Sequence, residues 1–237
     1  MKLLRSILPF LLLSFVAQAQ SPVKDGAILA EFSVSDSTKV YFSQGNLQYQ
    51  ASTGTWRFAE HQWDFVGDSI NGNVYENGVK SDNLKISPTY DGWIDLFAWG
   101  TSGYKDYMPY TIARYVIDVG IFNTNFDWGV YDWGVYNKIS NGGNRVKQWR
   151  TLDYYEWAYI IYHRKNGSHL LGVANVNGVN GLILLPDNWT LPEGIVFTSG
   201  RANHNGREYY ATINNYTASE WKQMVLCFFL LPATAYR

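Results

Sequence analysis

Hydrophobic and polar residues alternate in short runs through the first quarter of the chain, a pattern typical of half-buried β-strands. Residues 28–34 and 40–42 are rich in β-forming residues and lie on either side of a polar cluster, which predicts an opening hairpin. Residues 47–49 and 55–58 alternate around an Ala-Ser-Thr-Gly turn. They predict a second pair of strands.

Two helix starts can be recognised in the second half of the chain. Asp153 and Glu156 are spaced as a capping box. In this motif the aspartate side chain accepts a hydrogen bond from a free backbone amide in the first turn, and the glutamate side chain accepts one from the backbone amide of the cap residue. Apolar residues then recur at helical spacing until an Asn-Gly pair ends the pattern. Thr217 and Glu220 repeat the arrangement and predict a second, shorter helix.

Unbroken apolar runs at residues 182–185 and 225–231 predict buried strands. Residues 67–90 are rich in Asn, Gly, Ser and Asp and predict a long surface loop. Residues 91–100 carry too many aromatic side chains to remain in water, so we expect them to pack against the core. The predicted fold class is α+β, with many short strands, two helices and long loops.

The chain begins with a three-part pattern that predicts a signal peptide over residues 1–19. Two basic residues precede an apolar run at 7–16, and small residues at 17 and 19 form the cleavage site. The run is about ten residues long, whereas a membrane-spanning helix needs roughly 20. We therefore expect a mature chain from 20 to 237 without a membrane span, delivered to the periplasm, the outer cell surface or the extracellular space.

The mature sequence contains no Pro-rich, Ser-rich or charge-block linker, so residues 20–237 are expected to form a single domain. The whole chain has 19 basic and 20 acidic residues and a formal net charge of −1. Because no basic run is present to follow a phosphate backbone, nucleic acid is not an expected partner. No cofactor is expected either.

Cys227 is the only cysteine, so the chain cannot form an intramolecular disulfide. It lies within the apolar run at 225–231, which favours a buried strand and an inert thiol over a nucleophile. No histidine lies near it in sequence, and nothing around it indicates a lowered thiol pKa.

Three segments resemble a known family. Residues 149–159, Trp-Arg-Thr-Leu-Asp-Tyr-Tyr-Glu-Trp-Ala-Tyr, resemble the helix-opening stretch of formylglycine-generating-enzyme-like domains. Residues 92–104 and the Leu-Pro-Ala-Thr-Ala-Tyr-Arg motif at 231–237 look like secreted bacterial paralogues with that fold. The resemblance covers most of residues 28–237. It implies a variant of the C-type-lectin fold.

The same resemblance limits the activities that can be expected. The copper-dependent oxidase members use a pair of active-site cysteines, and the single Cys227 excludes that activity. Relatives typically continue past the terminal motif into a Gly-, Tyr-, Trp- and Ser-rich segment and a final strand that carries much of the binding surface. This sequence ends at Arg237, which implies either a binding surface elsewhere or a shortened member.

A tandem repeat, Asp-Trp-Gly-Val-Tyr copied in register at 127–131 and 132–136, is the most distinctive local feature. Strand alternation would put Trp128 and Trp133 on opposite faces, so a loop or turn is the expected setting. Indole rings beside carboxylates suit sugars, which stack on the rings and hydrogen-bond to acids and amides. The alternative is that these aromatic residues pack the core. The candidate ligand-binding residues are Asp127, Trp128, Tyr131, Asp132, Trp133 and Tyr136.

Catalytic and metal chemistry have weaker support in the sequence. Asp91 with Asp95, or Asp127 with Asp132, could act as general acid and base, but spacing alone fixes no distance between them. Residues 64–83 are rich in Asn and Asp without matching a calcium loop, and we expect no metal. The histidines also lack metal-type spacing: His61, His163, His169 and His204.

Together these observations favour a secreted, non-catalytic binding module that recognises glycans or cell-surface proteins through aromatic loops. Aromatic residues make up 17% of the chain, slightly more than the charged residues at 16%, and no coherent catalytic set accompanies them. A secreted carboxylate-based hydrolase is one alternative. A structural or assembly component of the cell surface is the other.

Overall fold

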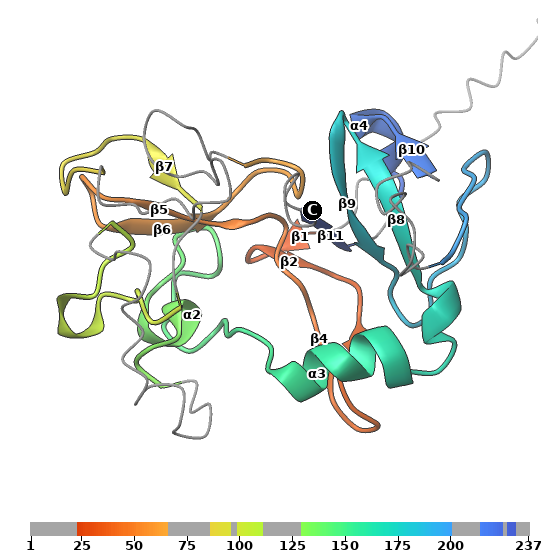
Figure 1. Cartoon of the computed structure of the whole chain (residues 1–237), viewed down its shortest axis with the longest axis horizontal. Coiled ribbons are helices and arrows are strands. Elements are labelled where there is room, and N and C mark those ends of the chain that lie inside the picture. The colour runs from red at the N-terminus through yellow and green to blue at the C-terminus, as the bar shows by residue number, and fades with distance from the viewer. Residues whose placement is uncertain are drawn as a thin grey trace, which may run out of the picture.

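The computed structural model describes residues 23–65, 86–95, 99–110, 129–200, 214–224 and 227–230. The architecture is mixed α+β, with short strands in small sheets, short helices and long loops (Figure 1). This confirms the predicted class at that level. The predicted signal peptide and most of the predicted loop at 67–90 lie outside the described residues.

The N-terminal part is built from two small hairpins. Strand β1 (Val23–Lys24) pairs with β2 (Ala27–Ile28), and β3 (Phe32–Ser33) pairs with β4 (Lys39–Val40), both antiparallel. The side-chain oxygen of Ser35 accepts a hydrogen bond from the amide of Thr38 and closes the second turn. The predicted opening hairpin is confirmed, with shorter strands than the sequence pattern suggested.

The second predicted strand pair forms the centre of a three-stranded sheet in the order β6-β5-β7. Strand β5 (Leu47–Gln50) pairs antiparallel with β6 (Thr55–Phe58) and with β7 (Trp93–Ile94). One face carries Tyr49, Trp56 and Ile94, which are buried. Ile94 is fully buried, so the predicted segment at 91–100 reaches the core at this residue, whereas Trp93 is half-buried on the other face and residues 96–98 lie outside the described part of the chain.

A four-stranded sheet in the order β10-β8-β9-β11 forms the C-terminal half. Strands β8 (Leu171–Val176) and β9 (Val179–Leu184) form a hairpin, whose two turn residues Asn177 and Gly178 have φ of 50° and 87°. Positive φ at both positions is what a type I′ turn requires. The flanking strands are β10 (Asn214–Tyr216), parallel to β8, and β11 (Cys227–Leu230), antiparallel to β9. Both predicted apolar strands are therefore present.

Both predicted capping boxes are present. Helix α3 (Tyr154–Ala158) begins after Asp153 and continues as the π-turn η3 (Tyr159–His163), and α4 (Ala218–Trp221) begins after Thr217. Three further short helices are α2 (Trp133–Tyr136), η2 (Tyr104–Asp106) and η4 (Gly167–His169). Among the described residues, no helix has the length and apolar character needed to cross a bilayer.

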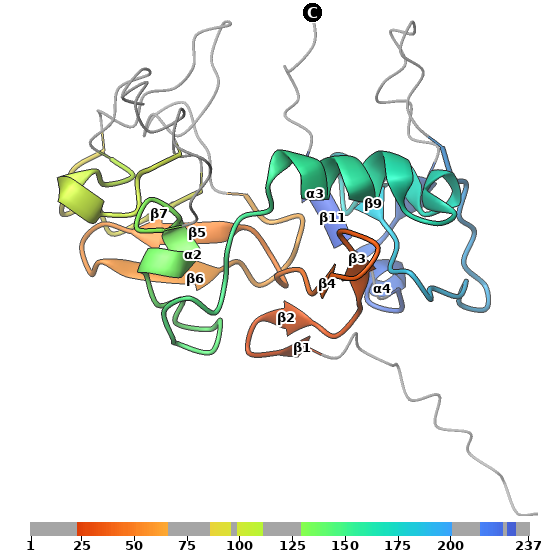
Figure 2. The same cartoon turned by 90° about the horizontal axis from the view of Figure 1, so that it is seen from below.

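Three hydrophobic clusters hold these elements together. Phe32, Ile160 and Leu184 belong to a cluster that joins the β3–β4 hairpin, the helix and the four-stranded sheet. Figure 1 and Figure 2 both show the helix formed by α3 and η3 lying against the β3–β4 hairpin. A second cluster packs Trp63, from the segment after β6, among residues of the four-stranded sheet. The third lies beneath the three-stranded sheet and contains Tyr49.

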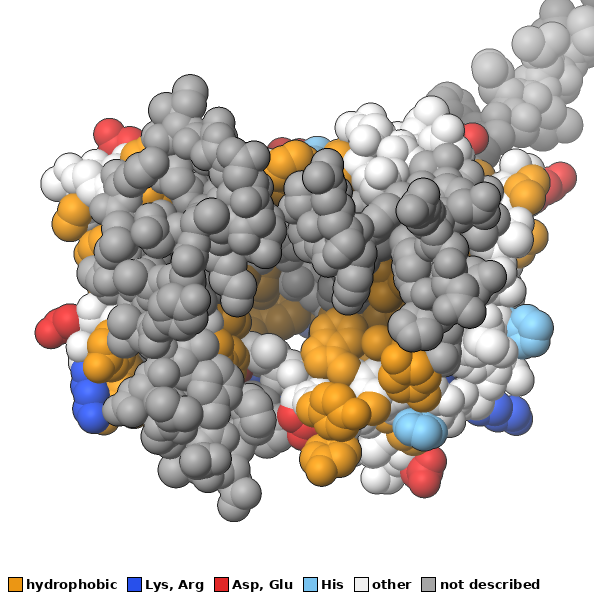
Figure 3. All heavy atoms as spheres, in the orientation of Figure 1, with side chains coloured by type: hydrophobic (Ala, Val, Ile, Leu, Met, Phe, Trp, Pro, Cys, Tyr) orange, Lys and Arg blue, Asp and Glu red, His pale blue; other side chains and the backbone are white. Residues whose placement is uncertain are grey.

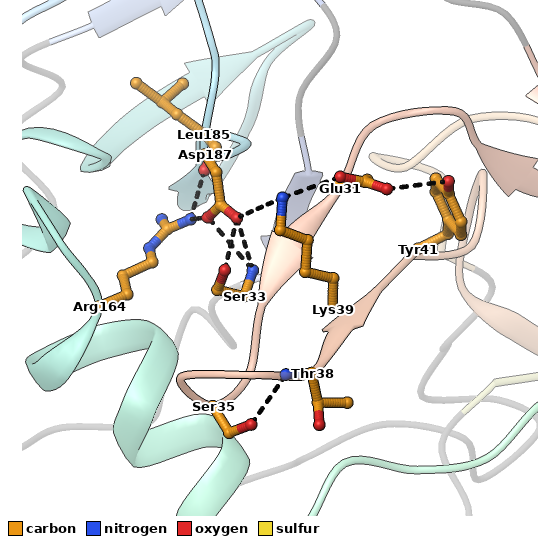
Figure 4. Close-up of polar contacts among 9 residues, drawn as sticks. All are labelled: Glu31, Ser33, Ser35, Thr38, Lys39, Tyr41, Arg164, Leu185 and Asp187. Atoms are coloured by element: carbon orange, nitrogen blue, oxygen red, sulfur yellow. Dashed lines mark hydrogen bonds and ion pairs between the residues drawn. The ribbon is translucent and has the colours of Figure 1, made fainter.

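A polar network also connects distant segments (Figure 4). The side chain of Arg164, which directly follows η3, is 1% exposed and donates to the carbonyl oxygens of Leu185 at 2.7 Å and Leu170 at 2.9 Å. Its Nη1 atom lies 3.6 Å from Oδ1 of Asp187. That carboxylate accepts hydrogen bonds from the amide and hydroxyl of Ser33. The network therefore fastens the N-terminal hairpin to the helix and the large sheet.

Candidate functional site

A loop or turn was expected for the tandem repeat, but its second copy forms the N-cap and all four residues of the one-turn helix α2, and only residues 129–131 before it form a turn. Asp132 caps this helix: its Oδ1 accepts from the amides of Gly134 at 2.9 Å and Val135 at 3.2 Å. Its Oδ2 accepts from the amide of Thr151 at 2.7 Å. The residue is 1% exposed, so this carboxylate holds the local fold and presents little surface to a ligand.

Trp133 is also engaged within the protein. Its indole nitrogen donates to Oγ1 of Thr101 at 3.1 Å, and its ring meets Trp99 edge-to-face at 5.0 Å. Gly134 explains part of the repeat, because a Cβ there would lie 2.7 Å from the Cβ of Trp149. These contacts match the packing alternative for Trp133 and Gly134.

Tyr131 and Tyr136 form the outer part of the repeat. Both rings contact Tyr104 edge-to-face, at centroid distances of 5.3 Å and 6.0 Å, and Tyr136 is 41% exposed. The structure thus brings two predicted site residues together on the surface. Asp127 and Trp128, from the first copy, lie outside the described residues.

Other exposed tyrosines lie on helix α3 and its π-turn, where Tyr154, Tyr155 and Tyr162 are prominent. Figure 3 shows hydrophobic side chains gathered at the lower centre of the view, where α3 lies in Figure 1. Exposed aromatic groups alone do not select a ligand. A hollow that combines charged and aromatic groups is a stronger candidate site.

Such a hollow lies beside the three-stranded sheet, on the face opposite Tyr49. The pocket has a volume of about 610 Å³. Gln48 of β5 and Arg57 of β6 line it together with the segment that follows β6. Because these two residues are cross-strand partners, their side chains share one face of the sheet. The segment after β6 contributes Glu60, Trp63, Asp64 and Phe65 to the lining.

Arg57 is the cation of this pocket. Its guanidinium carbon lies 3.6 Å from the centre of the Trp93 ring, and its Nε donates to Oε1 of Gln48 at 3.0 Å. Burial lowers the pKa of Arg57, while the negative charges of Asp64 and Glu60 act in the opposite direction. Within the described part of the chain, no protein group accepts a hydrogen bond from its two Nη atoms. They can therefore donate to a ligand.

The wall of the pocket is held by local hydrogen bonds. Oδ2 of Asp64 accepts from the amide of His61 at 2.9 Å and lies 3.2 Å from Nδ1 of the same residue. The imidazole stacks on Trp63 at 4.6 Å, and Trp63 packs into the cluster of the large sheet. Glu60 and Phe65 are exposed on this wall, Phe65 by 58%. A fixed wall therefore carries an exposed carboxylate and an exposed ring.

The proposed carboxylate pairs lie in different settings. Asp91 is exposed before β7 and Asp95 is half-buried after it. Asp132 is buried as a helix cap, while its partner Asp127 is outside the described residues. Glu60 and Asp64 are the two carboxylates that line the pocket, and the sequence pattern did not single them out.

The histidines are spread over the molecule. His61 supports the pocket wall, His163 and His169 are exposed, and His204 lies outside the described residues. In the segments that the structure describes, no three His, Cys, Asp or Glu side chains converge as a metal site would require.

Comparison with known protein families, curated proteins and solved structures finds no match for this chain. Sequence reasoning missed Arg57 because it occupied an ordinary polar position in a predicted strand. The available signal was the alternation in both strands, which puts Gln48 and Arg57 on the face away from the core.

Proposed function

We propose that this protein is an exported, non-catalytic binding module that holds a glycan in the pocket beside Arg57. The observation that carries the proposal is the composition of that pocket. A guanidinium with two uncommitted Nη atoms lies in the same hollow as two carboxylates and an exposed ring. Sites of this kind fix a ligand through a few placed polar groups beside apolar surface.

Sugars match this set of groups. Their hydroxyls both donate and accept, so Arg57 can donate to one hydroxyl while Glu60 accepts from another. The exposed ring of Phe65 can cover an apolar C–H face. With charges of both signs, the pocket suits an uncharged polyhydroxyl ligand better than a strongly acidic or basic one. Its volume, about 610 Å³, lies within the range of small-molecule sites.

The proposal also includes export from the cytoplasm and a specific fold type. The N-terminal signal pattern supports delivery to the periplasm, the outer cell surface or the extracellular space. The resemblance of residues 149–159 to formylglycine-generating-enzyme-like domains supports a C-type-lectin-like fold, and the capping box in this segment is consistent with it. Tyr131 and Tyr136 form a second aromatic surface that a larger glycan or a cell-surface protein can contact.

A secreted hydrolase is the second candidate, because Glu60 and Asp64 line one pocket. Most glycoside hydrolases use a pair of carboxyl groups as their catalytic residues. Asp64 is tied to His61, which favours a structural role for it. Recovery of a bound oligosaccharide intact after long incubation supports the binding module. Cleavage that is lost in Glu60→Gln supports the hydrolase.

The first experiment is a glycan array probed with the mature chain, residues 20–237, after circular dichroism confirms that it is folded. The proposal predicts selective binding to a limited set of neutral glycans. A folded protein that binds no glycan on the array contradicts it and directs the search to protein partners and a structural role.

A further inference from the structure

The polar face of the three-stranded sheet continues beyond the pocket. Gln48 lies opposite Arg57, and two residues further along β5, Gln50 lies opposite Thr55 on one side and Trp93 on the other. Directly opposed residues point to the same face, and so do residues two apart on one strand. Gln50, Thr55 and Trp93 therefore extend the floor that begins in the pocket.

Hydrogen bonds link the polar groups of this extension. The hydroxyl of Thr53, in the β5–β6 turn, is 2.7 Å from Oε1 of Gln50 and 2.8 Å from Oγ1 of Thr55. The Nε2 of Gln50 donates to the carbonyl oxygen of Asp91. Thr53 is exposed, and Gln50 and Thr55 are half-buried. The result is a surface row of hydroxyl and amide groups, which we name the hairpin strip (Gln50, Thr53 and Thr55).

Trp93 connects the pocket to the hairpin strip. The guanidinium of Arg57 lies over the ring of Trp93, and Trp93 is the cross-strand partner of Gln50. Two residues along a strand cover about 7 Å, so a group bound at Gln50 lies about one sugar ring away from a group bound at Arg57. A single sugar seated at Arg57 would leave the strip uncovered.

We infer that the ligand is an oligosaccharide of at least two sugar residues, which runs from the pocket along the β5–β6 hairpin over the hairpin strip. This inference rests on the proposed glycan-binding function and names the form of its ligand. An extended peptide is a poorer fit, because peptide recognition on sheets uses backbone pairing at an edge and pockets for alternate side chains. The hairpin strip offers a polar row on a sheet face.

The test compares oligosaccharides of increasing length on wild-type protein and on strip variants. Neutral homopolymer series of one to six residues, printed on one array, are probed with wild type, Gln50→Leu and Thr55→Val. Both substitutions nearly keep side-chain volume and remove hydrogen-bonding groups. Because one hydrogen bond is worth about 1 kcal/mol, each variant is expected to bind oligosaccharides roughly fivefold more weakly. Affinity for the single sugar is expected to stay unchanged.

Gln223→Leu is the matched control, since Gln223 is an exposed glutamine on the far C-terminal segment. Unchanged thermal melting of Thr55→Val shows that any effect is not a folding defect. Equal binding of single sugars and oligosaccharides by wild type overturns the inference while leaving the proposed function intact. So does unaltered oligosaccharide binding in both strip variants. Absence of binding to every glycan overturns the proposed function and the inference with it.

Discussion

The side chains of Arg57 and Asp132 differ in how many of their polar atoms are hydrogen-bonded within the protein. Both oxygens of Asp132 accept hydrogen bonds from backbone amides. Arg57 uses only its Nε in a hydrogen bond to a described residue, which leaves two nitrogens facing a pocket. For an individual residue, the presence or absence of hydrogen-bond partners within the protein therefore distinguishes a charge with a structural role from one that can bind a ligand.

Buried tyrosines give a prediction for alkaline pH. Burial raises the pKa of Tyr49 and of Tyr216 to about 12, from an ordinary value of 10.0. Because the folded-state pKa lies above the unfolded one, their contribution is complete below about pH 10 and is lost as pH rises toward 12. Urea unfolding between pH 8 and about 11.5 should therefore show stability falling above pH 10.

Replacing Tyr49 with phenylalanine should reduce that alkaline loss, since the substitution removes the ionising hydroxyl and keeps the ring. Tyr155→Phe is the matched control, because this tyrosine is 78% exposed. An alkaline loss of stability that is the same in Tyr49→Phe and wild type would show that this hydroxyl is not responsible.

At the scale of elements, the sequence predicted those whose signals are local. The capping pairs at Asp153 and Thr217 mark α3 and α4, and the alternating runs mark β5 and β6. The sequence does not indicate helix α2, because only four residues are helical and the cap residue Asp132 also fits the pattern of a ligand-binding residue. The pocket could not be predicted, because it depends on the segment after β6 folding back beside Gln48, which no local pattern specifies.

The capping box of α3 gives a prediction for acidic pH. Burial tends to raise the pKa of Glu156, but hydrogen bonds from Arg150 and the amide of Asp153, with the charge of Arg150, outweigh it and lower the pKa below its ordinary 4.5. This contribution is present above pH 4.5 and is lost as pH falls through the lowered pKa. Glu156→Gln should therefore cost about 1 kcal/mol at neutral pH and less at pH 3.

Chemical denaturation of Glu156→Gln and wild type at pH 7 and pH 3 measures this difference. Glu193→Gln, at an exposed glutamate outside any helix or strand, is the control and should match wild type at both pH values. A difference between Glu156→Gln and wild type that is equal at the two pH values would argue against ionisation as the cause.

For the whole molecule, the network around Arg164 joins segments that are far apart in sequence. Arg164→Met leaves Asp187 without its buried cation and removes the Arg164 donor from the carbonyl oxygens of Leu185 and Leu170, although Leu170 keeps the amide of Leu185 as a donor. Removing one partner of a buried ion pair typically costs about 3 kcal/mol or more of stability. We therefore expect the free energy of unfolding, measured in urea, to fall by about that amount. Lys165→Met, at the exposed neighbour, should change stability by less than about 0.5 kcal/mol.

If Arg164→Met does not fold, Asp187→Asn provides the measurement, since it removes the charge and keeps the shape of the side chain. It should lower stability by a smaller but measurable amount, because Ser33 retains a hydrogen-bond acceptor. Stability of Asp187→Asn equal to wild type would mean that the network does not fasten the hairpin to the sheet.

Two arginine variants on the glycan array show whether Arg57 holds the glycan. Arg57 and Arg145 each donate from Nε to a glutamine side chain, but only Arg57 lines the pocket. We expect that Arg57→Met, folded as judged by its melting temperature, loses the glycan binding of wild type while Arg145→Met retains it. Equal binding by wild type and both variants would contradict the assignment of the pocket as the glycan site.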